Sequence, residues 1–286
     1  MRAVAGPGRW VWGVSGLVTA AALAIPGVRL IGSAGDNRQV QPQAAVTRTV
    51  TVTEPVSSLT VQSYGASVQV TTGSARRVQI TETLAYDMQA GGPPAVTQSV
   101  SGGHLLLADP ACSASDCAVS FAVTVPPGVA VTVVTDGGPL TVAGTAGANL
   151  DSGGGPVRAT RIGGPLTVST GGGSLLLNGL AGALHADTDG GPLTAQGVDA
   201  AAATVSTGGG DAQIAFSAAP DTVTVSTDGG MAALTVPGGP YALAADSGGG
   251  PESVGIATDP AAPRSITVSS GGGPLQIEPP ADGPAT

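Results

Sequence analysis

Aliphatic residues recur at fixed distances on both sides of a Gly-Gly pair in the second half of the chain. They occupy the positions seven and five residues before the last glycine and, except at Glu252, the positions two and four residues after it. Apolar residues two apart predict strands with one buried face, so each Gly-Gly pair is expected to join two strands. The last glycines are Gly138, Gly155, Gly173, Gly191, Gly210, Gly230, Gly250 and Gly273.

The distance between these glycines is nearly constant, at 17 to 20 residues with a final step of 23. Aligned columns at such a period favour a coil that stacks on copies of itself over a meander of hairpins. The sequence thus predicts an all-β fold in which residues 131–277 form a single-stranded β-solenoid (β-helix) with Gly-Gly turns. Gly163-Gly164 is expected at a second corner. The glycines allow either a positive φ or a close approach of stacked backbones.

The position three residues before the last glycine carries a hydroxyl group in every repeat. We interpret this column as a ladder that caps turn amides and neighbouring repeats. An ice-binding strip is disfavoured, because it needs a flat Thr-x-Thr face and Ser or Asp mostly replaces the second threonine. The column consists of Thr135, Ser152, Thr170, Thr188, Thr207, Thr227, Ser247 and Ser270.

Residues 46–135 lack the Gly-Gly register. Short strands in this segment predict a β-rich lead-in that caps the first repeat and keeps its strand edges from adding further chains. Residues 33–45 are interpreted as a linker and residues 278–286 as a disordered tail.

The segment from Trp10 to Val28 carries no charge and follows Arg2 and Arg9. At a rise of about 1.5 Å per residue, it is just long enough to cross a hydrocarbon core of about 30 Å. Residues 1–32 are therefore expected to be a retained signal anchor with one transmembrane helix or a cleaved signal peptide. The β-rich body would lie outside the cytoplasm, tethered to the cytoplasmic membrane in the first case and secreted in the second.

Cys112 and Cys117 lie in a short polar stretch of a chain that is expected to be exported, where disulfides persist. We expect a local disulfide between them, with a pair of free thiols as the alternative. A metal site is a weaker interpretation, because the two cysteines and His104 lack a fourth ligand.

Composition and charge limit the partners. The net charge is −9, and adjacent basic residues occur only at Arg76-Arg77, so nucleic acid would be repelled. Aromatic residues make up only 2% of the chain, which suits a narrow solenoid with little room for rings.

The string FAVTVPPGVAVTVVTDGGPLTV, residues 121–142, closely resembles bacterial putative adhesins of a β-strand-repeat family of unknown function. Later turns such as DSGGGPVRA and DTDGGPLTA are similar to the repeated turn of that family, and the lysine-free composition is similar to that of actinobacterial members. The resemblance covers roughly residues 46–277. It implies a membrane-anchored, exported, right-handed β-helix and provides no catalytic residues to carry over.

The chain contains few residues that could form a catalytic site. His104 and His185 are far apart in the sequence and are expected on wet strand faces, which disfavours a Ser-His-Asp or histidine–metal site. A glycosidase needs clustered carboxylates with basic partners, and the repeats contain only Arg158, Arg161 and Arg264. We therefore predict no enzyme activity and no cofactor.

Calcium is the best metal candidate, because aspartates lie two or four residues before the last glycine, beside carbonyl-rich turns. A calcium-binding roll needs Asp at one fixed offset, whereas here Asp alternates with Ser and Gly between two offsets, which favours turn formation. The candidates are Asp136, Asp151, Asp187, Asp189, Asp228 and Asp246.

These observations predict a non-enzymatic, membrane-tethered β-solenoid for adhesion or cell-envelope interaction. Its partner would be a surface or envelope protein or a glycan. The alternative is a sensory or regulatory ectodomain for envelope stress. That role would need a membrane partner, because only nine residues precede the apolar segment.

Overall fold

The computed structural model describes residues 43–88, 92–109 and 117–281. In these residues 23 strands form two large mixed sheets, one of 12 strands and one of 11 strands, which confirms the all-β prediction. No helix in this part of the chain is long and apolar enough to span a membrane. The predicted membrane helix within residues 1–32 lies outside the described residues.

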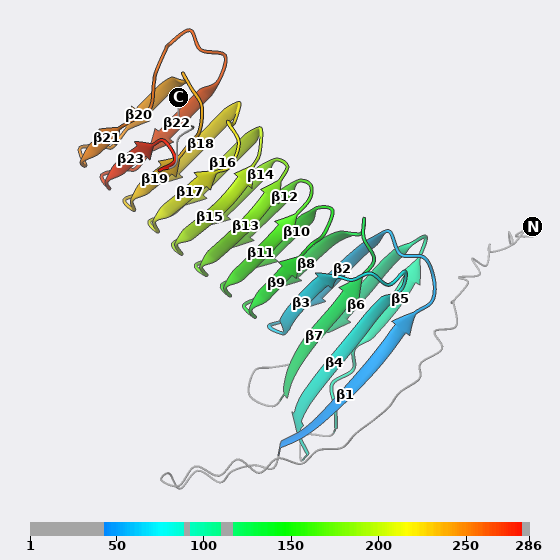
Figure 1. Cartoon of the computed structure of the whole chain (residues 1–286). Coiled ribbons are helices and arrows are strands. Elements are labelled where there is room, and N and C mark those ends of the chain that lie inside the picture. Colours follow the sequence, from blue (N-terminus) through cyan, green and yellow to red (C-terminus); the bar gives the residue numbers. More distant parts are fainter. Residues whose placement is uncertain (1–42, 89–91, 110–116, 282–286) are drawn as a thin grey trace, which may run out of the picture.

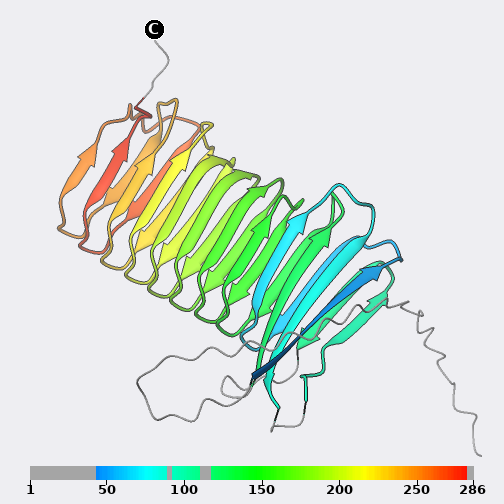
Figure 2. The same ribbon diagram turned by 60° about the horizontal axis from the view of Figure 1, so that its bottom comes forward.

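Along the repeats the chain alternates between the two sheets, which face each other along one elongated body (Figures 1 and 2). The strands before the glycine turns belong to the 11-stranded sheet, called sheet B: β8 (Ala130–Thr135), β10 (Ala148–Ser152), β12 (Leu166–Thr170), β14 (Leu184–Thr188), β16 (Ala202–Thr207), β18 (Thr222–Thr227), β20 (Ala242–Asp246) and β22 (Ser265–Ser269). The strands after the turns belong to the 12-stranded sheet A: β9 (Leu140–Ala143), β11 (Val157–Ile162), β13 (Leu175–Ala181), β15 (Leu193–Asp199), β17 (Ala212–Phe216), β19 (Ala232–Thr235), β21 (Glu252–Val254) and β23 (Leu275–Glu278).

Neighbouring repeat strands are parallel, and their register follows the sequence columns. Leu150, five residues before its glycine, pairs with Val133 on one side and Val168 on the other. In sheet A, Ala159 pairs in the same way with Val142 and Leu177. The columns predicted from the Gly-Gly spacing are therefore confirmed as hydrogen-bonded neighbours.

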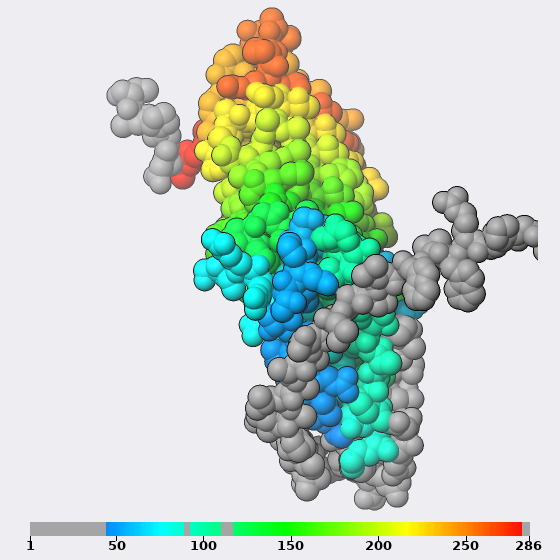
Figure 3. Space-filling view, turned by 90° about the vertical axis from the view of Figure 1, so that its right-hand side faces the viewer, coloured from blue at the N-terminus to red at the C-terminus, as the bar shows by residue number. Residues whose placement is uncertain are grey.

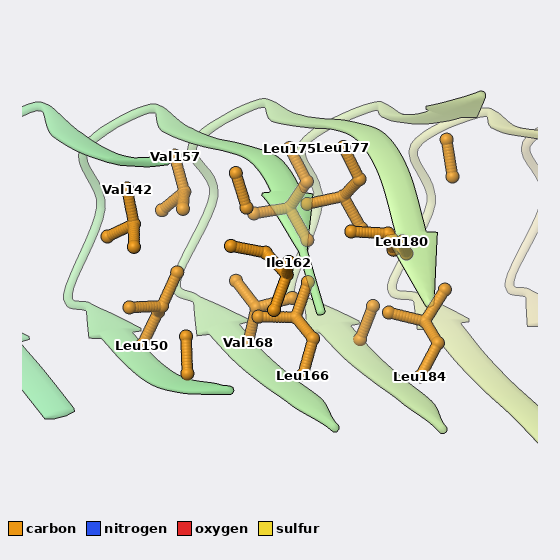
Figure 4. Packing of buried hydrophobic residues seen from close by; sticks show 14 of the residues in the cluster. Val142, Leu150, Val157, Ile162, Leu166, Val168, Leu175, Leu177, Leu180 and Leu184 are labelled. Atoms are coloured by element: carbon orange, nitrogen blue, oxygen red, sulfur yellow. The ribbon is translucent and has the colours of Figure 1, made fainter. Parts of the chain in front are cut away.

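The hydrophobic core fills the space between the two sheets. Figure 4 shows Val142, Leu175 and Leu177 pointing from sheet A toward Leu150 and Leu166 of sheet B. These five side chains are at most 1% exposed. The alternation of buried and exposed residues along each strand thus places one face of each sheet in the core and the other in solvent.

The last glycine of each turn is needed for close packing between repeats. None of the eight has a φ in the left-handed region. A Cβ added to Gly191 would lie 2.0 Å from the carbonyl oxygen of Gly173, and one added to Gly173 would lie 2.1 Å from that of Gly155. Close approach of stacked backbones is therefore the role of the last glycines, whereas the glycine before them takes the other expected role in several turns, with a φ of 138° at Gly209 and 133° at Gly229. Gly164, between β11 and β12, meets Ala146 in the same way and confirms the second corner.

The hydroxyl column is buried and forms the predicted ladder, except at Thr135, whose Oγ1 has no hydrogen-bond partner among the described residues. Within single turns, Thr227 Oγ1 donates to the Gly230 carbonyl oxygen at 2.6 Å, and Thr188 Oγ1 accepts from the Gly191 amide at 2.9 Å. Between repeats, Thr170 Oγ1 donates to Gly155 O at 3.2 Å.

The N-terminal strands occupy one end of the body, drawn blue to cyan, and the C-terminal strands occupy the other, drawn orange to red (Figure 3). The parallel ladder begins before the first Gly-Gly pair, because β2 pairs in parallel with β8, and β3 pairs in parallel with β9. Antiparallel pairing enters with β1, β4 and β5. The bounds are β1 (Gln43–Val52), β2 (Ser58–Ser63), β3 (Ser67–Thr72), β4 (Val78–Asp87), β5 (Thr97–Ser101), β6 (His104–Asp109) and β7 (Cys117–Val125).

The C-terminal strands do not stack in sequence order. Sheet B ends in the order β18-β22-β20 and sheet A in the order β19-β23-β21, so the last repeat lies inside the one before it. The spacing of the glycines predicts sequential stacking and does not anticipate this exchange. Because β21 is the outer edge of sheet A, Glu252 and Val254 lie in solvent, which explains the one exception to the aliphatic columns.

A buried tyrosine marks this end. Tyr241 is fully buried, and its hydroxyl donates to the carbonyl oxygen of Pro237 at 2.6 Å. Burial raises the pKa of Tyr241, an effect that Arg264 opposes, and Arg264 itself forms an ion pair with Asp221 at 3.7 Å.

Candidate functional site

A groove of about 370 Å³ opens where the N-terminal strands meet the first repeat. Its walls come from the ends of β2, β6 and β8 and the turns that follow β2 and β8. The lining residues are Gln62, Ser63, Tyr64, Ala108, Asp109, Val134 and Asp136. It is larger than a second hollow on sheet A, described below, and is the candidate site.

Strand register explains the shape of this groove. Gln62 of β2 lies between Ala108 of β6 and Val134 of β8, so these three residues form one row on the outer face of sheet B. One turn position further on, the Asp136 amide donates to the Ser63 carbonyl oxygen at 3.2 Å and holds the two turns together. Tyr64 follows Ser63 directly, and Tyr64 and Asp136 therefore stand at the turn edge of the row.

The groove combines exposed apolar surface with carboxylates. The side chains of Tyr64 and Val134 are 62% and 40% exposed, whereas Asp109 is only 2% exposed. Ser63 Oγ donates to Asp109 Oδ2 at 3.5 Å and accepts from the Ala66 amide at 3.0 Å. No arginine or histidine is among the described lining residues, so the site carries only negative charge.

A second, shallower hollow of about 240 Å³ lies on the outer face of sheet A. Small Ala215 and Ala233 lie between longer neighbours there, and the described lining has neither a charge nor a ring. It offers amides and hydroxyls only. The lining residues are Thr194, Ala195, Gln196, Gln213, Ile214, Ala215, Ala233 and Thr235.

The calcium candidates are spread along the repeats, and only Asp136 lies at the groove. Asp189 and Asp228 occupy the same turn position but are separated by the repeat of Gly208, because β14, β16 and β18 are successive neighbours. Asp246 accepts the Gly248 amide at 2.9 Å, as a turn-forming aspartate does. No group of three potential metal ligands forms among the described residues. Calcium binding at Asp136, Asp151, Asp187, Asp189, Asp228 or Asp246 stays open to test.

The two histidines lie apart on exposed strand positions, as predicted. His104 Nδ1 is 3.0 Å from Ser58 Oγ, the one serine–histidine contact in the described residues. No carboxylate contact to His104 occurs within that part of the chain, so the arrangement lacks the third member of a hydrolytic triad. His185 lies on the outer face of sheet B between Thr167 and Thr204.

One of the two cysteines of the predicted disulfide belongs to the described residues. Cys117 is the first residue of β7, and Cys112 lies outside the described residues. The pairing stays a prediction.

Glu82 is the perturbed carboxyl of the N-terminal region. It is 2% exposed, faces Arg48 across β1 and β4, and accepts a hydrogen bond from Gln98 Nε2 of β5. Burial raises the pKa of Glu82, and the Gln98 hydrogen bond and the Arg48 charge oppose that rise. The residue lies in the core of the N-terminal region, away from the groove lining.

Apart from Asp136, the groove residues were not identified from the sequence, although a signal existed. Ser63 pairs with Thr135 and so continues the hydroxyl column, and Ala66 occupies the place of the last glycine. In keeping with this alignment, a Cβ on Gly138 would meet the Ala66 carbonyl oxygen at 2.0 Å. Extending the hydroxyl column one repeat upstream would have placed Tyr64 beside Asp136.

Comparisons with known proteins assign no family. The sequence matches no known family and no curated protein. The fold is similar to a putative adhesin from Bacteroides fragilis, with 15% identity over 82% of this chain and 96% of that chain and a TM-score of 0.45. A putative adhesin from Parabacteroides distasonis has 12% identity over 82% and 96%, with a TM-score of 0.41. A putative lipid binding protein from the same species has 11% identity over 81% and 96%, with a TM-score of 0.37. These values are too low to support a function.

Proposed function

We propose that the protein is a non-enzymatic, exported, right-handed β-solenoid, tethered to the cytoplasmic membrane by its N-terminal segment and acting in adhesion or cell-envelope interaction. The parallel ladder carries the proposal. Strands that alternate between two sheets, each paired in register with the strand of the next repeat, are what a solenoid requires. Connections between parallel strands of one sheet are right-handed in nearly all proteins, which supports the handedness.

The surface supports a binding role. The outer faces of both sheets carry many polar side chains, and the groove adds exposed Tyr64 and Val134. Exposed apolar side chains beside polar groups are typical of binding surfaces.

The location is tested with a single exposed cysteine. Thr224→Cys places a thiol on the outer face of sheet B, and Val225→Cys places one in the core as the matched control. An impermeant maleimide should label Thr224→Cys on intact cells stripped of their outer wall, and Val225→Cys should stay unlabelled. Labelling of Thr224→Cys only after lysis would contradict export.

The binding role is tested with the full-length protein in detergent and purified cell-wall sacculi from the cells that produce it. We expect saturable cosedimentation. A protein that stays in the supernatant at all sacculus concentrations would contradict a role in cell-wall interaction.

A further inference from the structure

Among the described residues, the groove holds the most exposed aromatic ring, because Tyr86 is half-buried. Aromatic residues make up 2% of the sequence, and Phe121, Phe216 and Tyr241 are all buried. Tyr64 instead is 62% exposed, and Val134 beside it is 40% exposed. An exposed ring next to an exposed aliphatic side chain offers a flat apolar surface on which a ligand with an apolar face can stack.

The charge of the groove selects the ligand further. Asp109 and Asp136 line it, the described lining has no basic side chain, and the whole chain has a net charge of −9. A phosphate or carboxylate would be repelled, whereas a positively charged group would gain Coulomb energy from the exposed carboxylate of Asp136.

We propose that the groove binds an amino sugar, a glycan unit that carries a free ammonium group. The apolar face of the sugar ring stacks on Tyr64, the ammonium group binds Asp136, and ring hydroxyls bond to the Gln62 amide. A lysine side chain shares the ammonium group but lacks a flat ring face, so it would use the Asp136 carboxylate alone. This inference rests on the proposed envelope role and names the unit that the exported body would hold.

The ligand class is tested by calorimetric titration of the full-length protein in detergent at low salt. The probes are a tetramer of glucosamine and a tetramer of N-acetylglucosamine, which share a ring and differ in charge. We expect the glucosamine tetramer to bind about tenfold or more tightly than the acetylated one, and added salt to weaken its binding. Equal binding of the two tetramers would overturn the role of the ammonium group.

Substitutions at two residues assign the site. Tyr64→Ala should weaken binding of the glucosamine tetramer about tenfold, Tyr64→Phe should preserve it, and Asp136→Asn should weaken it and reduce its salt dependence. Asp228→Asn, an exposed aspartate at the same turn position of a later repeat, is the matched control and should bind as the unchanged protein does. Because Tyr64 and Asp136 are exposed, these changes should leave the melting temperature nearly unchanged.

A tetralysine peptide separates a glycan from a protein partner. If it binds as tightly as the glucosamine tetramer and loses as much affinity in Tyr64→Ala, the amino-sugar inference is wrong. Glucosamine binding that ignores Tyr64→Ala would also overturn it, as would no binding at all. Those results leave the envelope role standing, because maleimide labelling and sacculus cosedimentation test that role on their own.

Discussion

The repeats and the N-terminal region share the same two sheets, but different interactions specify them. In the repeats, neighbouring strands are parallel, and each inner column keeps its character from one repeat to the next, either aliphatic or, in one column, a hydroxyl. In the N-terminal region, the ten-residue strands β1 and β4 pair antiparallel and bury Glu82 between Ile80 and Leu84. The stacked repeats thus depend on inner side chains of the same kind in every repeat. The irregular N-terminal region accommodates the buried carboxyl group of Glu82 because Arg48 and Gln98 face it.

The largest expected effect on stability comes from placing in the core of the repeats a buried carboxyl group, which the N-terminal region tolerates at Glu82. Val205 is 1% exposed and lies between Ala186 and Val225 in sheet B. Val205→Asp buries a charge without a partner and should lower the free energy of unfolding by about 4 kcal/mol or more. The measurement is chemical denaturation, with Thr204→Asp, one residue away on the exposed face, as the control. Similar stabilities of the two variants would show that the column does not face inward.

The second effect tests the Gly-Gly corner of the repeats. Gly191→Ala brings a Cβ to 2.0 Å from the Gly173 carbonyl oxygen, so the backbones of two repeats must separate. We expect a loss of about 2–3 kcal/mol in the free energy of unfolding. Gly190→Ala is the matched control, because nothing lies within 4 Å of its Cβ, and it should change stability by no more than about 1 kcal/mol. Equal losses at both positions would argue against backbone approach as the reason for the glycine.

The third effect sharpens the picture of the N-terminal region. The pKa of Glu82 is raised above its ordinary value of 4.5 by burial. The folded state therefore loses stability as pH rises from about 4.5 through the folded-state pKa, and the loss is complete above it. Glu82→Gln cannot ionise, so it should be more stable than the unchanged protein at pH 8, by about 1 kcal/mol or less, and the difference should vanish at pH 4. A variant that is less stable at pH 8 would show that the Arg48 charge outweighs burial.

The smallest effect concerns the aspartates of the turns. If they only form turns, Asp189→Asn should change the free energy of unfolding by less than about 0.5 kcal/mol, because asparagine supports the same turn. A chelator should shift the melting temperature of the unchanged protein by no more than about a degree or two, since no folding free energy is linked to calcium. A rise of many degrees in millimolar calcium that Asp189→Asn weakens would instead indicate a calcium-stiffened stack.

Most of the fold could be predicted because each structural part of the repeat depends on a residue type that recurs at a fixed position in the sequence. Alternating aliphatic residues, a hydroxyl and a glycine at fixed offsets specify strand, turn and neighbour together, as the pairing of Leu150 with Val133 and Val168 shows. The antiparallel pairing of β1 with β4 could not be predicted, because neither strand shares a periodic signal with its partner. The exchanged order of β20 and β22 was also hidden, since their inner columns are alike.

The candidate site was less predictable than the fold. Asp136 was singled out as a calcium candidate, but its neighbours Tyr64 and Asp109 are 72 and 27 residues away in the sequence and meet it only through strand pairing. The glycine pair that marks every later turn is replaced by Gly65-Ala66 in the turn that bears Tyr64. A search for the repeat therefore misses this groove, because the groove forms where the repeat loses its Gly-Gly pair.

The exchanged order at the C-terminal end has a consequence for the timing of assembly. A chain is synthesised from its N-terminus, so β20 and β21 are complete before β22 and β23 exist. Until then the exposed edges of β18 and β19 are the places where β20 and β21 can pair, in the register that the repeat spacing allows. In the finished protein β22 and β23 hold those places. We therefore expect β22 and β23 to displace β20 and β21 from these edges or to pair there first. This end of the molecule can reach its final strand order only after residues 265–278 have been synthesised.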